Sequence, residues 1–263
     1  MPSIQAGDLN IHYIERGEGT PVLFIHGNWS TSSWWGPVLE RLPSGLRGIA
    51  YDMRGRGRTE GPDNGYTMSE LAADLYALCD ALNLDKFHLV GHSLGSAVAI
   101  QFTLENPGRV MTLTCVSPAW VDGMPAAYNV PAAQIAIKND RALFEQALKA
   151  QAPTVPDDDF WQHLLSEAHE QRIEAALRNL PALLEWKPGD KLKETGVPAL
   201  VISGQLDVLT GGANADRAAA ALGAQHIIIP AVGHSPIVEA PGEFTTLLAD
   251  HLRQTPAGSQ EDL

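Results

Sequence analysis

The sequence of 263 residues is poor in cysteine and in basic side chains, and it contains no long apolar run. Its two cysteines, Cys79 and Cys115, fall in apolar periodic segments, so we expect two isolated thiols in a reducing compartment. No window reaches transmembrane length, and the first residues lack the basic and apolar regions of a secretory signal. These absences predict a cytoplasmic protein.

The shortage of basic residues leaves a formal net charge of −13. Because such a surface repels nucleic-acid phosphates and anionic lipids, we expect neither nucleic acid nor membrane as a partner. The sequence also shows no nucleotide fingerprint, metal cluster or phosphate loop, so no metal and no cofactor are expected. A small-molecule substrate is compatible with this composition, as are a monomer and a homodimer.

Apolar runs alternate with helical patterns along most of the chain. A short early edge strand is predicted at 11–14, and further strands at 22–25, 46–51, 87–90, 110–116, 199–203 and 226–229. A capping box at 67–70 opens a helix to about 82, and other helices are predicted at 94–105, 213–222 and 244–253. This alternation predicts an α/β fold, a mostly parallel doubly wound sheet with helices on both faces.

The alternation is interrupted between residues 119 and 187, where no strand-like run occurs. Helical segments are predicted near 134–137, 141–150, 157–169 and 172–184, broken by Pro153, Pro156 and Pro181. We therefore expect a helical cap at 119–187 inserted into a core formed by 1–118 and 188–254. This cap would cover the carboxyl ends of the strands, where ligands bind in open α/β sheets. Residues 255–263 are polar, and we expect a disordered tail there.

A candidate nucleophile lies between a predicted strand and a predicted helix. Gly91, Ser93 and Gly95 fit the G-x-S-x-G pattern of a nucleophile elbow, in which glycines leave room for a sharp turn that exposes the serine hydroxyl. The pattern alone is weak, because a Gly-rich turn can hold an inert serine. Its position between the two elements makes Ser93 the predicted nucleophile.

A serine nucleophile needs a base and an acid from later loops at the same sheet edge. His234 follows the last predicted strand and is the predicted base. The remaining histidines lie in predicted strands or helices, in the elbow or in an early loop: His12, His26, His88, His92, His163, His169, His226 and His251. Asp207 is the predicted acid, with Asp122 as a competitor, and the order Ser93, Asp207, His234 matches that known for such elbows. Glu239 is interpreted as a structural partner.

Backbone amides must stabilise the oxyanion that forms when a serine attacks a carbonyl. The His26-Gly27-Asn28 stretch follows the strand at 22–25, so Asn28 and Leu94 are the predicted donors, and the Asn28 side chain is expected to face the pocket. A plain glycine turn is the alternative interpretation of this stretch.

Aromatic side chains are frequent around these loops and in the cap region. An aromatic residue on a helix is usually part of a core. Trp29, Trp120 and Met124 flank predicted loops at the sheet edge and are therefore the predicted substrate-pocket residues. Such a pocket would suit medium-length acyl chains or aryl esters.

Five motifs in this order resemble those of α/β-hydrolase-fold serine hydrolases over nearly the whole chain. They are Phe24-Ile-His-Gly27, Tyr51-Asp-Met-Arg-Gly-Arg-Gly-Arg-Thr59, Leu89-Val-Gly-His-Ser-Leu-Gly95, Gly204-Gln-Leu-Asp207 and Val232-Gly-His-Ser-Pro236. The resemblance implies an esterase or lactonase with a helical cap that cleaves carboxylic ester or lactone bonds by two-step acyl transfer.

The motifs are less informative about the substrate. The His26-Gly27-Asn28 loop resembles that of haloalkane dehalogenases, and the cap resembles that of epoxide hydrolases, but both families use an aspartate where this chain has Ser93. The same loop is similar to that of some acyl-homoserine lactone hydrolases. Carbon–carbon bond hydrolases and cofactor-free perhydrolases share the triad and are alternatives, as is a receptor-like protein that retains it.

Overall fold

A computed structural model describes residues 2–62 and 64–253, so the tail predicted at 255–263 lies outside the described residues. Eight strands form one sheet in the order β1-β2-β4-β3-β5-β6-β7-β8. The strands are β1 (Ser3–Ala6), β2 (Leu9–Arg16), β3 (Gly19–Ile25), β4 (Gly45–Tyr51), β5 (Phe87–His92), β6 (Val110–Val116), β7 (Ala199–Gly204) and β8 (Gln225–Ile229).

Strand directions in the sheet confirm the predicted fold class, with one correction. The pairs from β4 through β8 are parallel, whereas β2 pairs antiparallel with both β1 and β4. The expectation of an edge strand at 11–14 is therefore wrong, because that segment lies inside β2. The true edge is β1, a strand of four residues of which only Ala6 is buried, so it gives little hydrophobic signal.

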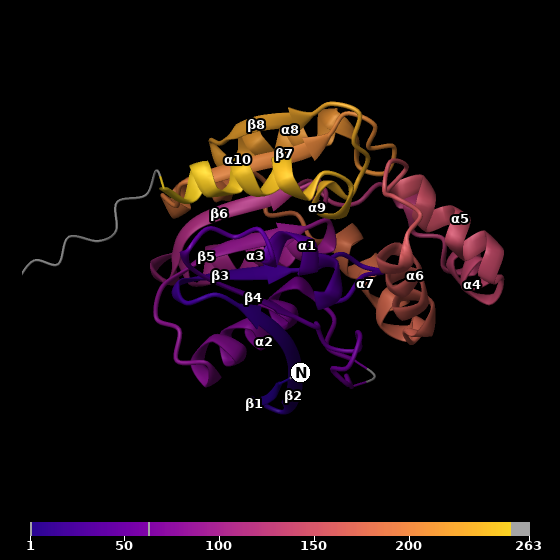
Figure 1. Ribbon diagram of the computed structural model, residues 1–263, viewed down its shortest axis with the longest axis horizontal. Helices are drawn as coiled ribbons and strands as arrows, with labels where there is room; N and C mark the ends of the chain where they lie inside the picture. The colour runs from indigo at the N-terminus through magenta and orange to yellow at the C-terminus, as the bar shows by residue number, and fades with distance from the viewer. Residues whose placement is uncertain (1, 63, 254–263) are drawn as a thin grey trace, which may run out of the picture.

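Helices cover both faces of the sheet (Figure 1). The helices α2 (Met68–Ala81), α3 (Leu94–Glu105) and α8 (Gly211–Leu222) contribute to the core on one face. The helices α1 (Gly36–Leu39), α9 (Pro236–Glu239) and α10 (Pro241–Arg253) contribute to the other. Short 3₁₀ helices lie at η1 (Ser32–Trp35), η2 (Pro107–Arg109), η3 (Ala126–Tyr128) and η4 (Gly189–Thr195). The capping box is present, because Thr67 and Glu70 bond each other's backbone amides.

Four helices lie between β6 and β7, at one side of the sheet (Figure 1). They are α4 (Pro131–Asn139), α5 (Arg141–Gln151), α6 (Asp159–Glu170) and α7 (Ile173–Glu185). We refer to this group as the cap helices. The break predicted at Pro181 is wrong, since α7 continues through it. Leu180 and Leu183 on the two sides of Pro181 are buried, and their packing holds the helix together where a hydrogen bond is missing.

The two cysteines lie in the core rather than in a disulfide. Cys79 of α2 and Cys115 of β6 are both buried and free, and burial raises the pKa of each thiol to about 12. Both therefore remain protonated and behave as small apolar side chains.

In the described part of the chain, no helix combines the length and apolarity that crossing a bilayer requires.

Candidate active site

The turn between β5 and α3 places Ser93 in a strained conformation. Ser93 has φ of 51° and ψ of −119°, a backbone conformation that residues other than glycine rarely adopt. The neighbouring glycines allow the tight packing. A Cβ atom at Gly91 would lie 2.3 Å from the Gly95 carbonyl oxygen, and one at Gly95 would lie 2.3 Å from the Ile25 carbonyl oxygen. The Ser93 amide donates to the Val116 carbonyl at 2.9 Å, which ties the turn to the end of β6.

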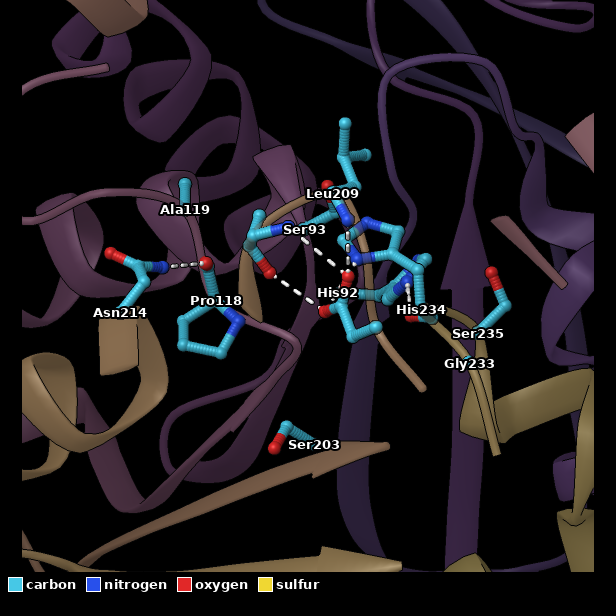
Figure 2. Close-up of polar contacts among 12 residues, drawn as sticks. His92, Ser93, Pro118, Ala119, Ser203, Leu209, Asn214, Gly233, His234 and Ser235 are labelled. Atoms are coloured by element: carbon cyan, nitrogen blue, oxygen red, sulfur yellow. Dashed lines mark hydrogen bonds and ion pairs between the residues drawn. The ribbon is translucent and has the colours of Figure 1, made fainter. Parts of the chain in front are cut away.

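His234 and Asp207 meet across two loops at the carboxyl edge of the sheet. His234 Nδ1 donates to Asp207 Oδ2 at 2.9 Å, and both side chains are buried. This bond leaves His234 Nε2 as the nitrogen available to accept a proton, and Nε2 has no hydrogen-bond partner among the described residues. Ser93 and His234 line the same cavity, and both side chains are drawn in Figure 2. The arrangement suits a serine hydroxyl with an imidazole oriented by a carboxylate.

The loop after β7 holds Asp207 as a carboxylate. Its Oδ1 accepts from the amides of Leu209 and Thr210 at 2.9 and 3.1 Å, and its Oδ2 accepts from the Thr210 hydroxyl at 2.8 Å. Burial acts to raise the pKa of Asp207, but the bonds from His234 and Thr210 outweigh it and hold the pKa well below its usual range. Asp207 therefore stays ionised opposite the imidazole.

The competing carboxylate lies elsewhere. Asp122 forms a bidentate ion pair with Arg217 of α8 at 2.7 Å, and just over half of the Asp122 side chain is exposed. The structure thus brings Asp207, and not Asp122, to His234. Glu239 lies in α9, where its carboxylate accepts from the amides of Gly233 and Ser235 at 3.0 Å on either side of His234. This contact shapes the loop, as expected of a structural partner.

A second buried histidine supports the first. His92 Nε2 donates to the His234 backbone carbonyl at 2.8 Å, and the two ring centroids are 5.0 Å apart (Figure 2). Burial, followed by the proximity of His234, lowers the pKa of His92 to about 3. His92 is therefore neutral, and its role is to fix the backbone that carries His234.

The two residues predicted to supply the oxyanion donors, Asn28 and Leu94, line the same cavity as Ser93. Leu94 is the first residue of α3, so its amide is among the helix-start donors without an intrahelical acceptor. The Asn28 amide has no acceptor among the described residues. A Cβ atom at Gly27 would lie 3.4 Å from Ser93 Cβ, which shows how closely this loop approaches the elbow. The predicted donors are therefore adjacent to the predicted nucleophile.

Asn28 lines the cavity, but the polar atoms of its side chain have partners within the protein. Its Oδ1 accepts from Arg56 Nη2 and from Asn179 Nδ2, the latter at 3.2 Å. Its Nδ2 donates to the Ala176 carbonyl at 3.4 Å. Both polar ends of the side chain are thus used in contacts with the loop after β4 and with α7.

A cavity of about 150 Å³ opens beside Ser93, and most of its wall is apolar. The predicted pocket residues Trp29, Trp120 and Met124 all line it. The cap helices supply residues that the sequence did not single out as pocket residues, including Ile137, Leu148, Leu180 and Leu183. They could not be recognised from the sequence, because an apolar stripe on a helix has the same pattern whether it faces a core or a cavity.

The polar part of the cavity wall consists of histidines and neutral side chains. No Asp, Glu, Lys or Arg is among the described residues that line it. Its polar groups are neutral side chains such as Gln134, whose Oε1 accepts from Trp29 Nε1 at 3.2 Å, and Gln151. A charged substrate group would lose its hydration there without gaining a counter-ion, which disfavours it.

A second serine, histidine and aspartate set lies away from this cavity. His226 of β8 contacts Ser203 Oγ at 2.7 Å and Asp216 Oδ1 at 2.7 Å. Ser203, however, lies within β7, is 1% exposed and does not line the cavity of Ser93. A serine, a histidine and an aspartate in contact are therefore not enough to identify a catalytic site. The site of Ser93 differs from this set because its serine lines a cavity that can hold a substrate. No cluster of His, Cys, Asp and Glu able to hold a metal occurs within residues 2–62 and 64–253.

Comparisons with known proteins agree with this architecture. The sequence model described as the alpha/beta hydrolase family matches residues 22–247. A protein named putative carbamate hydrolase RutD, from Rhizobium rhizogenes strain K84, is 28% identical over 92% of this chain and 96% of its own.

Solved structures show the same similarity. Est816, described as an N-acyl homoserine lactone degrading enzyme, is 29% identical, with a TM-score of 0.77 over 95% of this chain and 99% of its own. The enol-lactonase from Burkholderia xenovorans LB400 is 21% identical, with a TM-score of 0.85 over 96% of this chain and 100% of its own. The latter likeness is one of fold.

Proposed function

The chain belongs to the alpha/beta hydrolase family, and from this premise we propose that it is a serine hydrolase that cleaves a small, uncharged carboxylic ester or lactone. The observation that carries the proposal is the strained Ser93 at a cavity also lined by His234, which Asp207 orients at 2.9 Å. This combination provides a nucleophile, a base and a carboxylate that orients the base, the three roles that acyl transfer by a serine uses.

The proposed mechanism has two acyl-transfer steps. His234 Nε2 takes the proton of Ser93 Oγ as that oxygen attacks the substrate carbonyl, and the resulting oxyanion accepts from the amides of Asn28 and Leu94. The tetrahedral intermediate expels the alkoxide, which His234 protonates. Water then attacks the acyl-enzyme with His234 again as base, and collapse releases the acid and restores Ser93. Asp207 stabilises the imidazolium in both steps.

The neutral, apolar wall of the cavity supports an uncharged substrate with an acyl or aryl group of modest size. A cavity of about 150 Å³ is comparable to one that accommodates benzene. The similarity to an acyl-homoserine lactone degrading enzyme favours testing lactones beside aryl esters. A carbamate is the second candidate, favoured by the similarity to putative carbamate hydrolases along almost the whole chain, and its cleavage would use the same residues.

A substrate panel with a covalent probe tests the proposal. We expect a fluorophosphonate to label the wild-type protein at Ser93 and not Ser93→Ala, and wild-type protein to hydrolyse p-nitrophenyl butyrate. We also expect hydrolysis to be at least about tenfold slower for a p-nitrophenyl ester of similar acyl length that ends in a carboxylate. Among the described residues, the cavity wall offers no Lys or Arg to pair with that negative charge. Homoserine lactones and aryl carbamates complete the panel.

The outcomes separate the alternatives. Absence of labelling would contradict the serine hydrolase and favour a receptor-like protein. Labelling without turnover of any ester, lactone or carbamate would favour a carbon–carbon bond hydrolase or a perhydrolase. Equal turnover of the neutral and the charged ester would contradict the uncharged substrate class.

A further inference from the structure

A buried arginine lies behind the loop that carries Asn28. Arg56 follows β4 between Gly55 and Gly57, which have φ of 68° and 49°. Side chains are excluded at both glycines, since a Cβ atom would lie 2.8 Å from Ala175 of α7 at Gly55 and 2.2 Å from Asp52 at Gly57. The Arg56 backbone is fixed by hydrogen bonds to Met53 and Thr59. This turn directs the Arg56 side chain into the protein, between the core and the cap helices.

The guanidinium of Arg56 has unusual surroundings for a charge. Arg56 is 1% exposed, and within the described residues it forms no ion pair, unlike Arg54, which is paired with Asp74. Its Nη2 donates to Asn28 Oδ1, whereas Nε and Nη1 have no partner in the described part of the chain. Burial lowers the pKa of Arg56 to about 9, so the group is still charged at neutral pH. An unneutralised charge at such a site is costly in folding free energy.

The charge acts on the loop next to Ser93. Asn28 Oδ1 accepts hydrogen bonds from both Arg56, which follows β4, and Asn179 of α7. One side-chain oxygen is thus bonded both to the core and to the cap helices. Burial is the main cause that lowers the pKa of His26 to about 4; the negative charge of Asp52 and a backbone hydrogen bond to Gly27 oppose it, and the positive charge of Arg56 adds a smaller contribution that lowers the pKa. Arg56 itself is not among the residues that line the cavity. Any effect of Arg56 on the substrate is therefore indirect, exerted through its hydrogen bond to Asn28 and through the electric field of its charge.

We propose that Arg56 is a positioning residue of the oxyanion site, which clamps Asn28 together with Asn179 and provides a positive charge that favours the tetrahedral oxyanion over the neutral ester. The inference rests on the proposed function. Its physical basis is that a charge in a water-excluded site is weakly screened and is already in place when the negative charge develops. A neutral ground state gains little from the same field, so kcat is affected rather than KM.

Arg56→Met removes the charge and the hydrogen bond at similar volume, and Arg56→Lys retains only the charge. We expect Arg56→Met to lower kcat for p-nitrophenyl butyrate by about 10- to 100-fold, somewhat less than the loss of a whole oxyanion donor, with KM within about twofold. A trifluoromethyl ketone, to which a serine adds to form an anionic hemiketal, should lose affinity by a similar factor. Arg56→Lys should recover part of both.

Wild-type labelling at Ser93 and wild-type ester turnover are measured first, so a failure of the proposed function is recognised before the variants are compared. If wild type is active and folded Arg56→Met keeps wild-type kcat and ketone affinity, the inference is overturned. It is equally overturned if KM rises while ketone affinity is retained, which indicates a purely structural role. If Arg56→Met does not fold, Arg56→Lys and Asn179→Ala decide. Each is expected to lower kcat and ketone affinity together, and unchanged values in both would overturn the inference.

Discussion

At the scale of single residues, the orientation of one imidazole depends on which carboxylate reaches it. The Asp207 carboxylate accepts three hydrogen bonds from its own loop and one from His234. These bonds hold both of its oxygens in place. Asp122 also follows a strand of the parallel sheet, but its ion pair with Arg217 holds it at the surface. The proposed roles of the two aspartates therefore differ sharply, although both are carboxylates in loops.

Asp207→Asn is expected to lower kcat/KM by about 10⁴-fold, because an amide no longer stabilises the imidazolium or its correct tautomer. The matched control Asp122→Asn should remain within about twofold of wild type, since an exposed ion pair contributes little. Initial rates with p-nitrophenyl butyrate measure both. A large loss in Asp122→Asn with little loss in Asp207→Asn would reverse the assignment.

At the scale of elements, the cap helices form much of the wall of the cavity. Leu180 and Leu183 come from one face of α7, and Trp120 from the segment before the cap helices, where its ring centroid lies 5.0 Å from that of Tyr128. Met124 is tied to α7 through its amide, which donates to the Leu183 carbonyl at 2.9 Å. The acyl group that fits is therefore set by side chains from several separate segments.

Substitutions in this wall are expected to change the preferred acyl length in opposite directions. Leu183→Phe narrows the cavity and should shift the optimum toward acetate, whereas Trp120→Ala should shift it toward longer chains. Each methylene that gains or loses burial is worth about 0.8 kcal/mol, or roughly a fourfold rate difference. kcat/KM for p-nitrophenyl esters from C2 to C8 measures the profile.

Ile135→Ala is the control for this series, because Ile135 lies on α4 but is exposed and does not line the cavity. Its profile should match that of wild type. Unchanged profiles in both Leu183→Phe and Trp120→Ala would show that the acyl group binds elsewhere.

At the scale of the whole molecule, several histidines are buried in a neutral state. Burial lowers the pKa of His26 and His88 to about 4 and that of His92 to about 3. In the unfolded chain these groups take up protons near pH 6.5. The unfolded state therefore binds more protons between about pH 6.5 and 4, and the free energy of unfolding falls as pH decreases through that window.

His88→Gln is expected to reduce the pH dependence of stability. Each histidine that titrates only in the unfolded state contributes a slope of about 1.4 kcal/mol per pH unit. His88 is buried in β5, and its Nδ1 contacts Thr112 Oγ1 at 2.8 Å, a contact that a glutamine can replace in part. Urea unfolding at pH 7.5, 6 and 5 gives the slope for both proteins. Equal slopes would show that His88 takes up its proton in the folded state as well.

The comparison of sequence with structure follows the same scales. Local periodicity determined the alternation of strands and helices, the helix cap at Thr67 and the turn at Ser93, because these depend on neighbouring residues. The edge strand β1 and the continuity of α7 through Pro181 were missed, since pairing and packing overcame weak or contrary local signals.

By itself, the sequence determined the fold class and the short list of side chains from which a hydrolase site could be built. The tertiary structure decided which of them meet: Asp207 rather than Asp122 at His234, the Asn28 side chain against Arg56 and α7, and a neutral cavity beside Ser93. The physical reason is that these contacts join segments far apart in the chain. Their distances depend on strand order and on helix packing, which no local pattern encodes.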